Sequence, residues 1–517
     1  MRSTLFTNQR AWQMAALLLC LLLLAQQGLY IRQAPWVGDY WEHRAVLNEL
    51  IRQPLHPAHP IVAANQPHAF FSPYLMAAGG LGHLLQLDAA TLLNLLSLLN
   101  LLLFFAAVGI LARLFLPPGP PGRSFTLLLL TLLVCWGVDP PFFSSFFHLR
   151  AFPYSLGYPS TFSFVGAVLA AGLFQQLISR PGRKWQKGAL SLLLLLTGSV
   201  VLLTHPLTFL FLGSLLFAAG LQTKIPLRQW LPWLAAVLVL PFVVAGLWPW
   251  YPFYSLLGYA GAGHQFHSDS RELYSNIYLE LYPLALPLIL LLLNGKPGVR
   301  RHLPLLLAAL PLALLFFYGY FTGAYGWGRM VAFLAVLGQL VFLRETLHRY
   351  QQRPSFILPA AALLLCLPYA LPALATNYRT SVTPVVTCKA LPGEPFGLLP
   401  PACVAHRLGS ISHYIGYGDL VLADSTCNRY LPGYGARVVA SVFPAYWITD
   451  NDARREELRQ FFAPEGDSSR EGLIRRITPR WVVLTPDHHT IRQQLDTLAF
   501  LQLTADTAGI RLYRVLQ

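Results

Sequence analysis

The chain has 517 residues, of which 55% are hydrophobic and 11% are charged, and its mean hydropathy is +0.50. This composition is too apolar for a soluble protein of that length, so it predicts a polytopic membrane protein. The formal net charge of +15 does not indicate a nucleic-acid-binding protein, because the basic residues form short clusters between apolar runs and no long basic patch.

Apolar runs that approach the length needed to cross a bilayer, about 17–25 residues, recur as far as residue 374. The first run is interpreted as a retained span and not as a cleaved secretory signal, because no small-x-small cleavage site precedes Gln26 and Gln27. We predict about eleven spans, at residues 11–30, 88–116, 124–138, 160–179, 188–204, 206–221, 230–248, 281–294, 303–320, 329–344 and 356–374.

The loops between these spans alternate between basic loops and loops that are nearly free of Lys. Basic loops lie in the cytoplasm under the positive-inside rule. The N-terminus is therefore expected in the cytoplasm, and an odd number of spans places the chain after residue 375 outside. This arrangement predicts a multi-pass protein of the inner (cytoplasmic) membrane. The basic residues that set the orientation are Arg2, Arg10, Arg123, Arg180, Arg183, Lys184, Lys187, Lys224, Arg228, Lys296, Arg300, Arg301, Arg344, Arg349 and Arg353.

Three long outer loops, at residues 31–87, 139–159 and 249–280, interrupt the predicted membrane domain of residues 1–376. The last two are rich in Tyr, Trp, Phe, His, Gly and Pro. An ordinary aromatic belt at the membrane surface is the simpler interpretation, but it needs only a few rings at each helix end. We therefore expect these loops to be partly embedded and to line a cavity on the outer side.

Residues 377–517 are predicted to form a soluble extracytoplasmic α/β domain, large enough to hold its own core. The segments DLVLADS, ARVVASVF and RWVVLTP have the pattern of strands, and DNDARREELRQFF and HHTIRQQLDTLAFL that of helices. A terminal hairpin is expected to turn at Ala508 and Gly509. Cys388 and Cys403 flank a Pro-rich connector on the oxidising side, where we predict a disulfide.

The start of the first outer loop, GDYWEHRAVLNELIRQ (38–53), concentrates charge in a chain that has little. Asp39 and Glu42 have the spacing of a capping box at a helix start, which is a purely structural explanation. Asp39 and His43 are four residues apart and share one face of that helix. A carboxylate at a membrane surface also suits a general base that removes the proton of an acceptor hydroxyl.

The order of these features resembles the GT-C superfamily of integral-membrane glycosyltransferases, which includes mannosyl-, arabinosyl- and aminoarabinosyltransferases. An acid follows the first span, the Pro-aromatic run NQPHAFFSPYLMAAGGLGHLL (65–85) leads into the second, and about a dozen spans precede an outer domain. The segments VLADSTCNRYLPGYGARVV, ARREELRQFF and RWVVLTP are similar to that superfamily's outer domain.

The resemblance implies an inverting hexosyl- or pentosyltransferase that uses a sugar linked to polyprenyl phosphate. The acceptor would be a glycan, lipid or protein of the cell envelope. Asp39 matches the catalytic acid of the first loop, and Glu42 is the other match. The acid doublet of many members is absent, since Tyr40 follows Asp39, so a divalent metal is left open as a cofactor and no metal ligands are assigned. The expected substrate cavity contains Tyr40, Trp41, His43, His68, Tyr154, Tyr158 and Trp327.

A lipid phosphate needs cationic partners on the outer side, because a buried unpaired charge is costly. Arg329 is the first candidate, because Gly326 and Gly328 beside it allow a ligand to approach the backbone. Arg150 and His205 are further candidates for donor phosphate binding. An arginine that only extends to the membrane surface remains the alternative for Arg329.

Two other functions stay open from the sequence. One is a transferase similar to O-antigen ligases, which would use a diphosphate-linked donor and outer Arg and His residues. The other is a non-enzymatic transport or assembly subunit, although few charges occur inside the spans and no repeat is present. The tripeptides DND (450–452) and DHH (487–489) resemble metal motifs, but each opens a predicted helix, so we interpret the first as a helix cap and assign no metal to either.

Overall fold

The computed structural model describes residues 9–32, 38–179, 183–261, 269–352, 357–382, 401–442, 446–463 and 470–516. The chain forms two compact units. Unit 1 comprises residues 1–29 and 96–380, and unit 2 comprises residues 30–95 and 381–517. The first outer loop thus folds with the C-terminal region, whereas the sequence-based division assigned residues 31–87 to the membrane domain.

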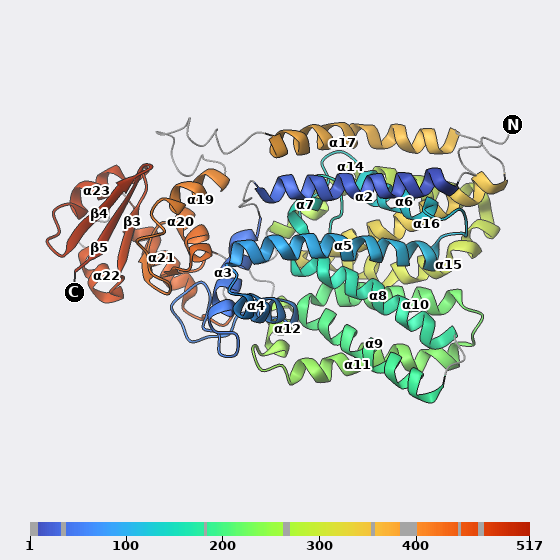
Figure 1. Ribbon diagram of the computed structural model, residues 1–517, viewed down its shortest axis with the longest axis horizontal. Coiled ribbons are helices and arrows are strands. Elements are labelled where there is room, and N and C mark those ends of the chain that lie inside the picture. The colour runs from blue at the N-terminus through green and yellow to red at the C-terminus, as the bar shows by residue number, and fades with distance from the viewer. Residues whose placement is uncertain are drawn as a thin grey trace. The chain divides into compact units, whose positions relative to one another are not determined.

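Long helices that run side by side make up unit 1 (Figure 1). Each of the predicted spans overlaps one of them, and the spans at 281–294 and 303–320 both lie in α15, which breaks at Gly295 where φ is 58°. Gly accommodates this left-handed backbone without a steric penalty. The long helices, three of which extend into unit 2, are α2 (Gln9–Arg32), α5 (Ala89–Phe115), α6 (Arg123–Val134), α8 (Pro159–Ser179), α9 (Lys184–Thr204), α10 (Pro206–Gln222), α11 (Leu227–Gly246), α15 (Ala285–Thr322), α16 (Met330–Gln352) and α17 (Ile357–Val382).

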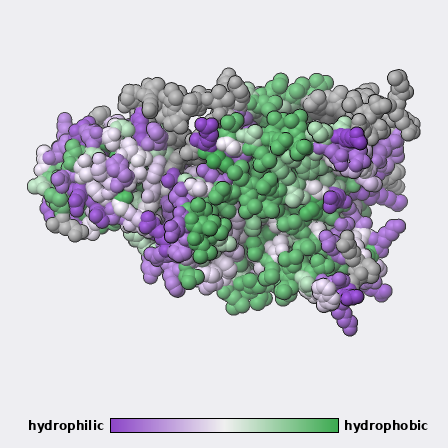
Figure 2. Space-filling view, viewed as in Figure 1, coloured by the Kyte–Doolittle hydropathy of each residue, from purple (hydrophilic) through white to green (hydrophobic). Residues whose placement is uncertain are grey.

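The side chains on the outer surface of these helices indicate whether the helices face water or lipid. Within the described residues, seven helices are long and apolar enough to cross a membrane, and three shorter apolar helices accompany them. Leucines that would be buried in a soluble protein are exposed on them, and Figure 2 shows a broad hydrophobic area over the helices of unit 1. Only lipid makes such a surface favourable. The chain is a multi-pass membrane protein.

The loops between the spans contain short helices. These are α7 (Phe152–Ser155), α12 (Phe253–Gly261), η1 (Asp269–Arg271), α13 (Glu272–Ser275), α14 (Ile277–Leu281), η2 (Tyr282–Leu284) and η3 (Tyr325–Arg329). Aromatic rings of the loop at 139–159 pack inside unit 1, since Phe147 and Phe152 each lie 5.0 Å from the ring of Phe104 on α5. These rings are core residues and do not belong to a surface belt; the outer cavity stays a prediction.

Unit 2 contains the predicted α/β fold. Its five-stranded sheet has the order β2-β1-β3-β5-β4, in which β1, β2 and β3 are parallel and β4 and β5 form the predicted hairpin around Ala508 and Gly509. The strands are β1 (Leu420–Leu422), β2 (Arg437–Val438), β3 (Trp481–Leu484), β4 (Leu501–Thr507) and β5 (Ile510–Val515). Helices α19 (Pro401–Gly409), α20 (Ser425–Tyr430), η5 (Leu431–Tyr434), α21 (Asn451–Phe461), α22 (Arg470–Ile477) and α23 (His489–Leu495) accompany the sheet.

The first outer loop supplies two more helices to unit 2, α3 (Tyr40–Arg52) and α4 (Pro73–Leu85). Between them the chain reaches the sheet, where Val62 forms a parallel bridge with Val438 and the backbone N–H of Val438 donates to the carbonyl of Ile61 at 2.8 Å. Val46, Leu47 and Leu50 of α3 are fully buried. The helix that begins beside Asp39 is therefore part of a folded unit with the C-terminal sheet.

Candidate active site

Asp39 lies at the start of α3 and is exposed to solvent. Its side chain makes no capping hydrogen bond, so the predicted capping box is wrong. The reason is local: φ is −89° and ψ is 12° at Asp39, whereas a capping residue adopts extended backbone that directs its side chain at the first free N–H groups. The backbone carbonyl of Asp39 accepts from the N–H groups of Glu42 and His43, both at 3.1 Å.

Glu42 is largely buried, one turn after Asp39, and 16% of its side-chain surface is exposed. Burial, and after it the charge of Asp39, raises the pKa of Glu42 to about 8. The two carboxyl groups are therefore close enough to interact, and their surroundings differ: Asp39 is exposed, whereas burial keeps Glu42 protonated at neutral pH. Such a difference separates acid and base roles in catalytic carboxyl pairs.

Glu42 lies beside His68, which is one of three buried histidines in this part of unit 2. Nε2 of His68 lies 3.6 Å from Oε1 of Glu42, the rings of His59 and His68 are 5.0 Å apart, and His43 stacks on Phe70 at 4.9 Å. Burial is the main cause that lowers the pKa of His43 and of His68 to about 3, and it holds the pKa of His59 well below its ordinary value. All three rings are thus neutral at physiological pH.

The tautomer of His68 follows from its hydrogen bonds. Nδ1 of His68 accepts from the backbone N–H of Phe70 at 3.3 Å, so the single ring proton is on Nε2, which faces Glu42. His59 is held in a similar way, since its Nδ1 accepts from the N–H groups of Ile61 and Val62, both at 3.2 Å. The sequence analysis did not identify His59; its place between Ala58 and Pro60 in HPAHP gave no periodic signal.

Two of the predicted phosphate-binding residues lie together in unit 1. Arg329 ends the short helix η3, and His205 lies in the turn between α9 and α10. Burial, and after it the positive charge of Arg329, lowers the pKa of His205, so the two side chains interact. Nδ1 of His205 lies 2.7 Å from the Thr208 hydroxyl and accepts from the Thr208 backbone N–H at 3.3 Å, which leaves the ring proton on Nε2.

The structure corrects the role expected of Gly328, which was to let a ligand approach the backbone beside Arg329. A Cβ on Gly328 would lie 2.8 Å from Cε2 of Tyr274 and 3.1 Å from Cβ of Leu273. Gly328 is therefore required for packing against α13, and it does not open the backbone to a ligand. The guanidinium of Arg329 itself lies 5.6 Å from the ring centroid of Phe143, which holds it against the loop at 139–159.

The other predicted residues of unit 1 have defined surroundings. Arg150 pairs with Asp139 at 2.6 Å; the Asp139 side chain is largely exposed and the Arg150 side chain is half-buried. Tyr154 is half-buried against Phe142, whose ring centroid is 4.8 Å away, and Tyr158 is buried. Trp327, partly exposed in η3, packs its Cβ beside Gly319. In unit 2, Tyr40 and Trp41 are buried at 8% and 1% exposure.

A further acid of unit 1, Glu280 on α14, had no signal in the sequence. Glu280 is buried, with 5% of its surface exposed. Burial, followed by the charges of Glu272 and Asp139, raises the pKa of Glu280 to about 7. The backbone carbonyl of Glu280 accepts from the N–H of Gly137 at 2.7 Å, which fixes α14 against the end of α6.

The two tripeptides with the look of metal motifs have structural partners. Asp450 occupies the cap position of α21 without a capping hydrogen bond and pairs with Arg454 at 2.8 Å, so its predicted capping role is also wrong. His488 lies 3.3 Å from Asp424. No group of three His, Cys, Asp or Glu side chains that could hold a metal ion occurs in the described part of the chain.

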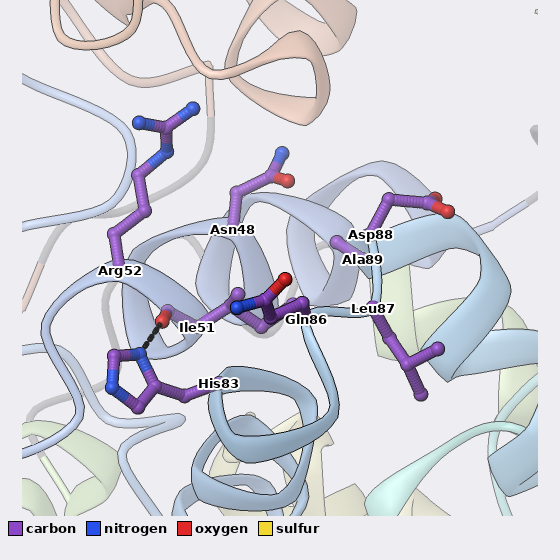
Figure 3. Close-up of a pocket in the computed structure, with 8 residues that line it drawn as sticks. All are labelled: Asn48, Ile51, Arg52, His83, Gln86, Leu87, Asp88 and Ala89. Atoms are coloured by element: carbon purple, nitrogen blue, oxygen red, sulfur yellow. Dashed lines mark hydrogen bonds between the residues drawn. The ribbon is translucent and has the colours of Figure 1, made fainter.

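A shallow pocket of about 500 Å³ lies at the other end of α3 (Figure 3). Asn48 and Arg52 enter it from α3, and Nδ1 of His83 donates to the carbonyl of Ile51 at 2.7 Å along its wall. Neither Asp39 nor Glu42 lines it. The remaining lining residues are Gln86, Leu87, Asp88 and Ala89.

No protein-family model and no curated protein matches the sequence. Solved structures do match the fold. The apo crystal structure of ArnT from Cupriavidus metallidurans is 12% identical, covers 98% of both chains and gives a TM-score of 0.51. The oligosaccharyltransferase AglB from Archaeoglobus fulgidus, in complex with an inhibitory peptide and a dolichol-phosphate, is 13% identical over 98% of this chain and 74% of its own, with a TM-score of 0.49. The chain therefore shares its fold with this ArnT structure over almost the whole of both chains.

Proposed function

We propose that the chain is a membrane glycosyltransferase that transfers a sugar from a polyprenyl-phosphate carrier to an envelope acceptor on the outer face of the membrane. The observation that carries this proposal is the carboxyl pair at the start of α3. Asp39 is exposed, while Glu42 is buried with a pKa of about 8, and both follow the first span in a chain of GT-C fold. An exposed carboxyl that can accept a proton, beside a buried one that stays protonated, suits acid–base chemistry at neutral pH.

In this mechanism Asp39 accepts the proton of the acceptor hydroxyl. The hydroxyl oxygen then attacks the anomeric carbon of the donor, a C–O glycosidic bond forms, and the bond from that carbon to the phosphate oxygen breaks. The configuration inverts in this single displacement. The lipid phosphate leaves with the electron pair of the broken bond. Glu42 stays neutral, so it does not compete with Asp39 for the proton.

The departing phosphate gains negative charge, which cations and N–H groups can stabilise. We assign this role to Arg329 and to Nε2 of His205, which interact in unit 1. Arg329 is a permanent cation, and the neutral His205 offers one N–H donor because Thr208 occupies its Nδ1. Arg150 is a weaker candidate because Asp139 already balances its charge.

The test uses the full chain in lipid nanodiscs with undecaprenyl-phosphate hexose and pentose donors and a mixture of envelope glycan and lipid acceptors. We expect one donor to give product and free undecaprenyl phosphate with the wild type, and none with Asp39→Asn. Asp450→Asn is the matched control, because Asp450 also starts a helix of unit 2 without capping it. Equal turnover by wild type and Asp39→Asn would contradict the assignment of the base, and no turnover of any lipid-phosphate donor would contradict the function.

The proposed orientation is tested separately by thiol labelling in intact cells. The cysteine-free chain carries one engineered cysteine, at position 184 or at position 466. An outer-face reagent should label 466 and leave 184 unmodified, because the basic loop at 180–187 is expected in the cytoplasm. The reverse pattern would place the candidate base on the wrong side for a lipid donor at the outer face.

A further inference from the structure

A second carboxylate of α3, Glu49, is held by the C-terminal part of unit 2. Glu49 follows Glu42 by seven residues, which is about two helical turns, and it is completely buried. Its Oε2 accepts hydrogen bonds from the guanidinium of Arg437 and from the hydroxyl of Tyr417, and its Oε1 accepts from the N–H of Ala58 at 2.7 Å. Glu49 thus joins α3 to the sheet and to the loop that carries His59.

Arg437 is the centre of this arrangement. It begins β2, is 7% exposed, and donates from a second nitrogen to the carbonyl of Pro60 at 2.7 Å. Its guanidinium also lies 5.4 Å from the ring centroid of Tyr417. One side chain of the C-terminal sheet therefore fixes α3 through Glu49 and fixes the segment between His59 and Val62 through Pro60.

The charge of Arg437 also reaches the candidate site. It is among the causes that lower the pKa of His59 and of His68, after burial. The titratable groups that face His68 are Glu42 and His43 from α3, and His59 from its own loop. Among them, Glu42 is neutral at physiological pH because of its raised pKa. Arg437 is paired with Glu49, and its charge is nevertheless the next cause, after burial, that lowers the pKa of His68.

Stability alone does not account for such a buried pair. The desolvation of two ions offsets most of their attraction, and well-packed apolar residues of similar volume commonly stabilise a protein as well or better. A fixed geometry and a fixed field at the neighbouring histidines are what apolar residues would not supply.

We propose that Arg437 is a positioning residue for the transfer reaction, through which the C-terminal sheet sets the place of α3 and of the loop that carries His59 and His68. This inference rests on the proposed function. It assigns the α/β region of unit 2 an effect on the transfer reaction. Arg437 contacts no substrate in this account; it acts through Glu49, Pro60 and His68.

The decisive variant is the pair Arg437→Met with Glu49→Met. Arg437→Met alone leaves a buried, unpaired carboxylate, and that variant can fail to fold. The double variant removes both charges together and keeps the core apolar. We expect it to fold and to transfer sugar more slowly with donor binding unchanged, because α3, which begins beside the base Asp39, is no longer held by Arg437. Arg437→Lys should keep part of the wild-type rate, because Lys can still pair with Glu49.

A second readout does not depend on transfer. The pKa of His68 is measured by carbon NMR of histidine-labelled protein in nanodiscs, with His68→Gln to assign the signal. We expect a rise in the double variant and no change in Arg480→Met, a control that breaks an exposed pair with Asp419 in the same sheet. An unchanged His68 pKa in the double variant would overturn the inference. If the pKa rises while no variant, nor the wild type, transfers sugar, the proposed function has failed and the positioning of His68 stands.

Discussion

The two units hold their polar groups in different ways. In unit 2 the acids lie on one helix, α3, whose buried face and buried Glu49 are fixed by a sheet more than 380 residues further along the chain. In unit 1 the candidate cations occupy a short helical turn and the junction of two apolar helices. The comparison teaches where each unit can hold candidate polar groups. Unit 1, which faces lipid, holds them where its spans end, whereas unit 2 holds them along a helix that packs into its core.

The largest effect should come from the acids. Asp39→Asn should lower transfer by about 10² to 10⁴-fold, the usual cost of losing a general base. Its folding should be unchanged, because the Asp39 side chain makes no capping hydrogen bond. Rates and membrane abundance are measured together with Glu42→Gln, which should keep most of its activity because Glu42 is already neutral at pH 7. A fully active Asp39→Asn variant together with an inactive Glu42→Gln variant would show that Glu42 is the base and Asp39 is not.

The corresponding change in unit 1 should affect binding. Arg329→Gln removes a charged hydrogen-bond donor, a loss of about 1.5–3 kcal/mol, which corresponds to roughly 10 to 150-fold in affinity. Binding of undecaprenyl phosphate in nanodiscs is measured by quenching of intrinsic tryptophan fluorescence. Arg150→Gln is the matched control and should weaken binding less, because Asp139 pairs with Arg150. Equal losses for both variants would argue for a general effect of positive charge and against a specific site.

The oxidation state of the cysteines should also differ between the two units. Cys403 is disulfide-bonded, and Cys388 lies outside the described residues, so the pairing of these two cysteines stays a prediction. Closing a loop of about 15 residues contributes roughly 3 kcal/mol in the chain-entropy account. Non-reduced mass spectrometry should find this bond in unit 2, while Cys135 and Cys366 of unit 1 are free thiols. A free thiol at Cys388 would contradict the pairing.

The smallest effect concerns the pH dependence of stability. The pKa of Glu42 is about 8 in the folded protein, against an ordinary value of 4.5, so the folded state binds one more proton between these pH values. The free energy of unfolding should therefore fall as pH rises, by about 1.4 kcal/mol per pH unit where the difference is a full proton.

Thermal unfolding between pH 7 and pH 8 reports mainly this contribution, because the buried histidines act in the opposite sense and at lower pH, and the raised pKa of Glu280, about 7, adds a smaller decline in the same sense. Their lowered pKa values cost stability only as pH falls below about 6.5. Glu42→Gln should remove most of the decline between pH 7 and pH 8. A decline of the same size in Glu42→Gln would assign it to another group.

The sequence predicted most of the helical framework, because a membrane span can be recognised from local hydropathy alone. The strands of the C-terminal region followed from local alternation in the same way. Asp39 was singled out as a candidate because charged residues are few in this chain, and its role stays a prediction. The link between Glu49 and Arg437 had no local signal, and neither did the approach of His205 to Arg329. The capping box failed for the opposite reason: its spacing is present, but the backbone at Asp39 does not adopt the angles that capping requires.

The most direct test of the central claim is a single-turnover experiment with donor-saturated Asp39→Asn in nanodiscs. The donor is the undecaprenyl-phosphate sugar that the wild type uses, and both bound donor and released undecaprenyl phosphate are measured in one sample. The account predicts wild-type donor binding with the sugar–phosphate bond left intact after acceptor is added, because the phosphate-binding residues lie in unit 1 and the base lies in unit 2. Cleavage at the wild-type rate, or loss of donor binding equal to the loss of transfer, would contradict it.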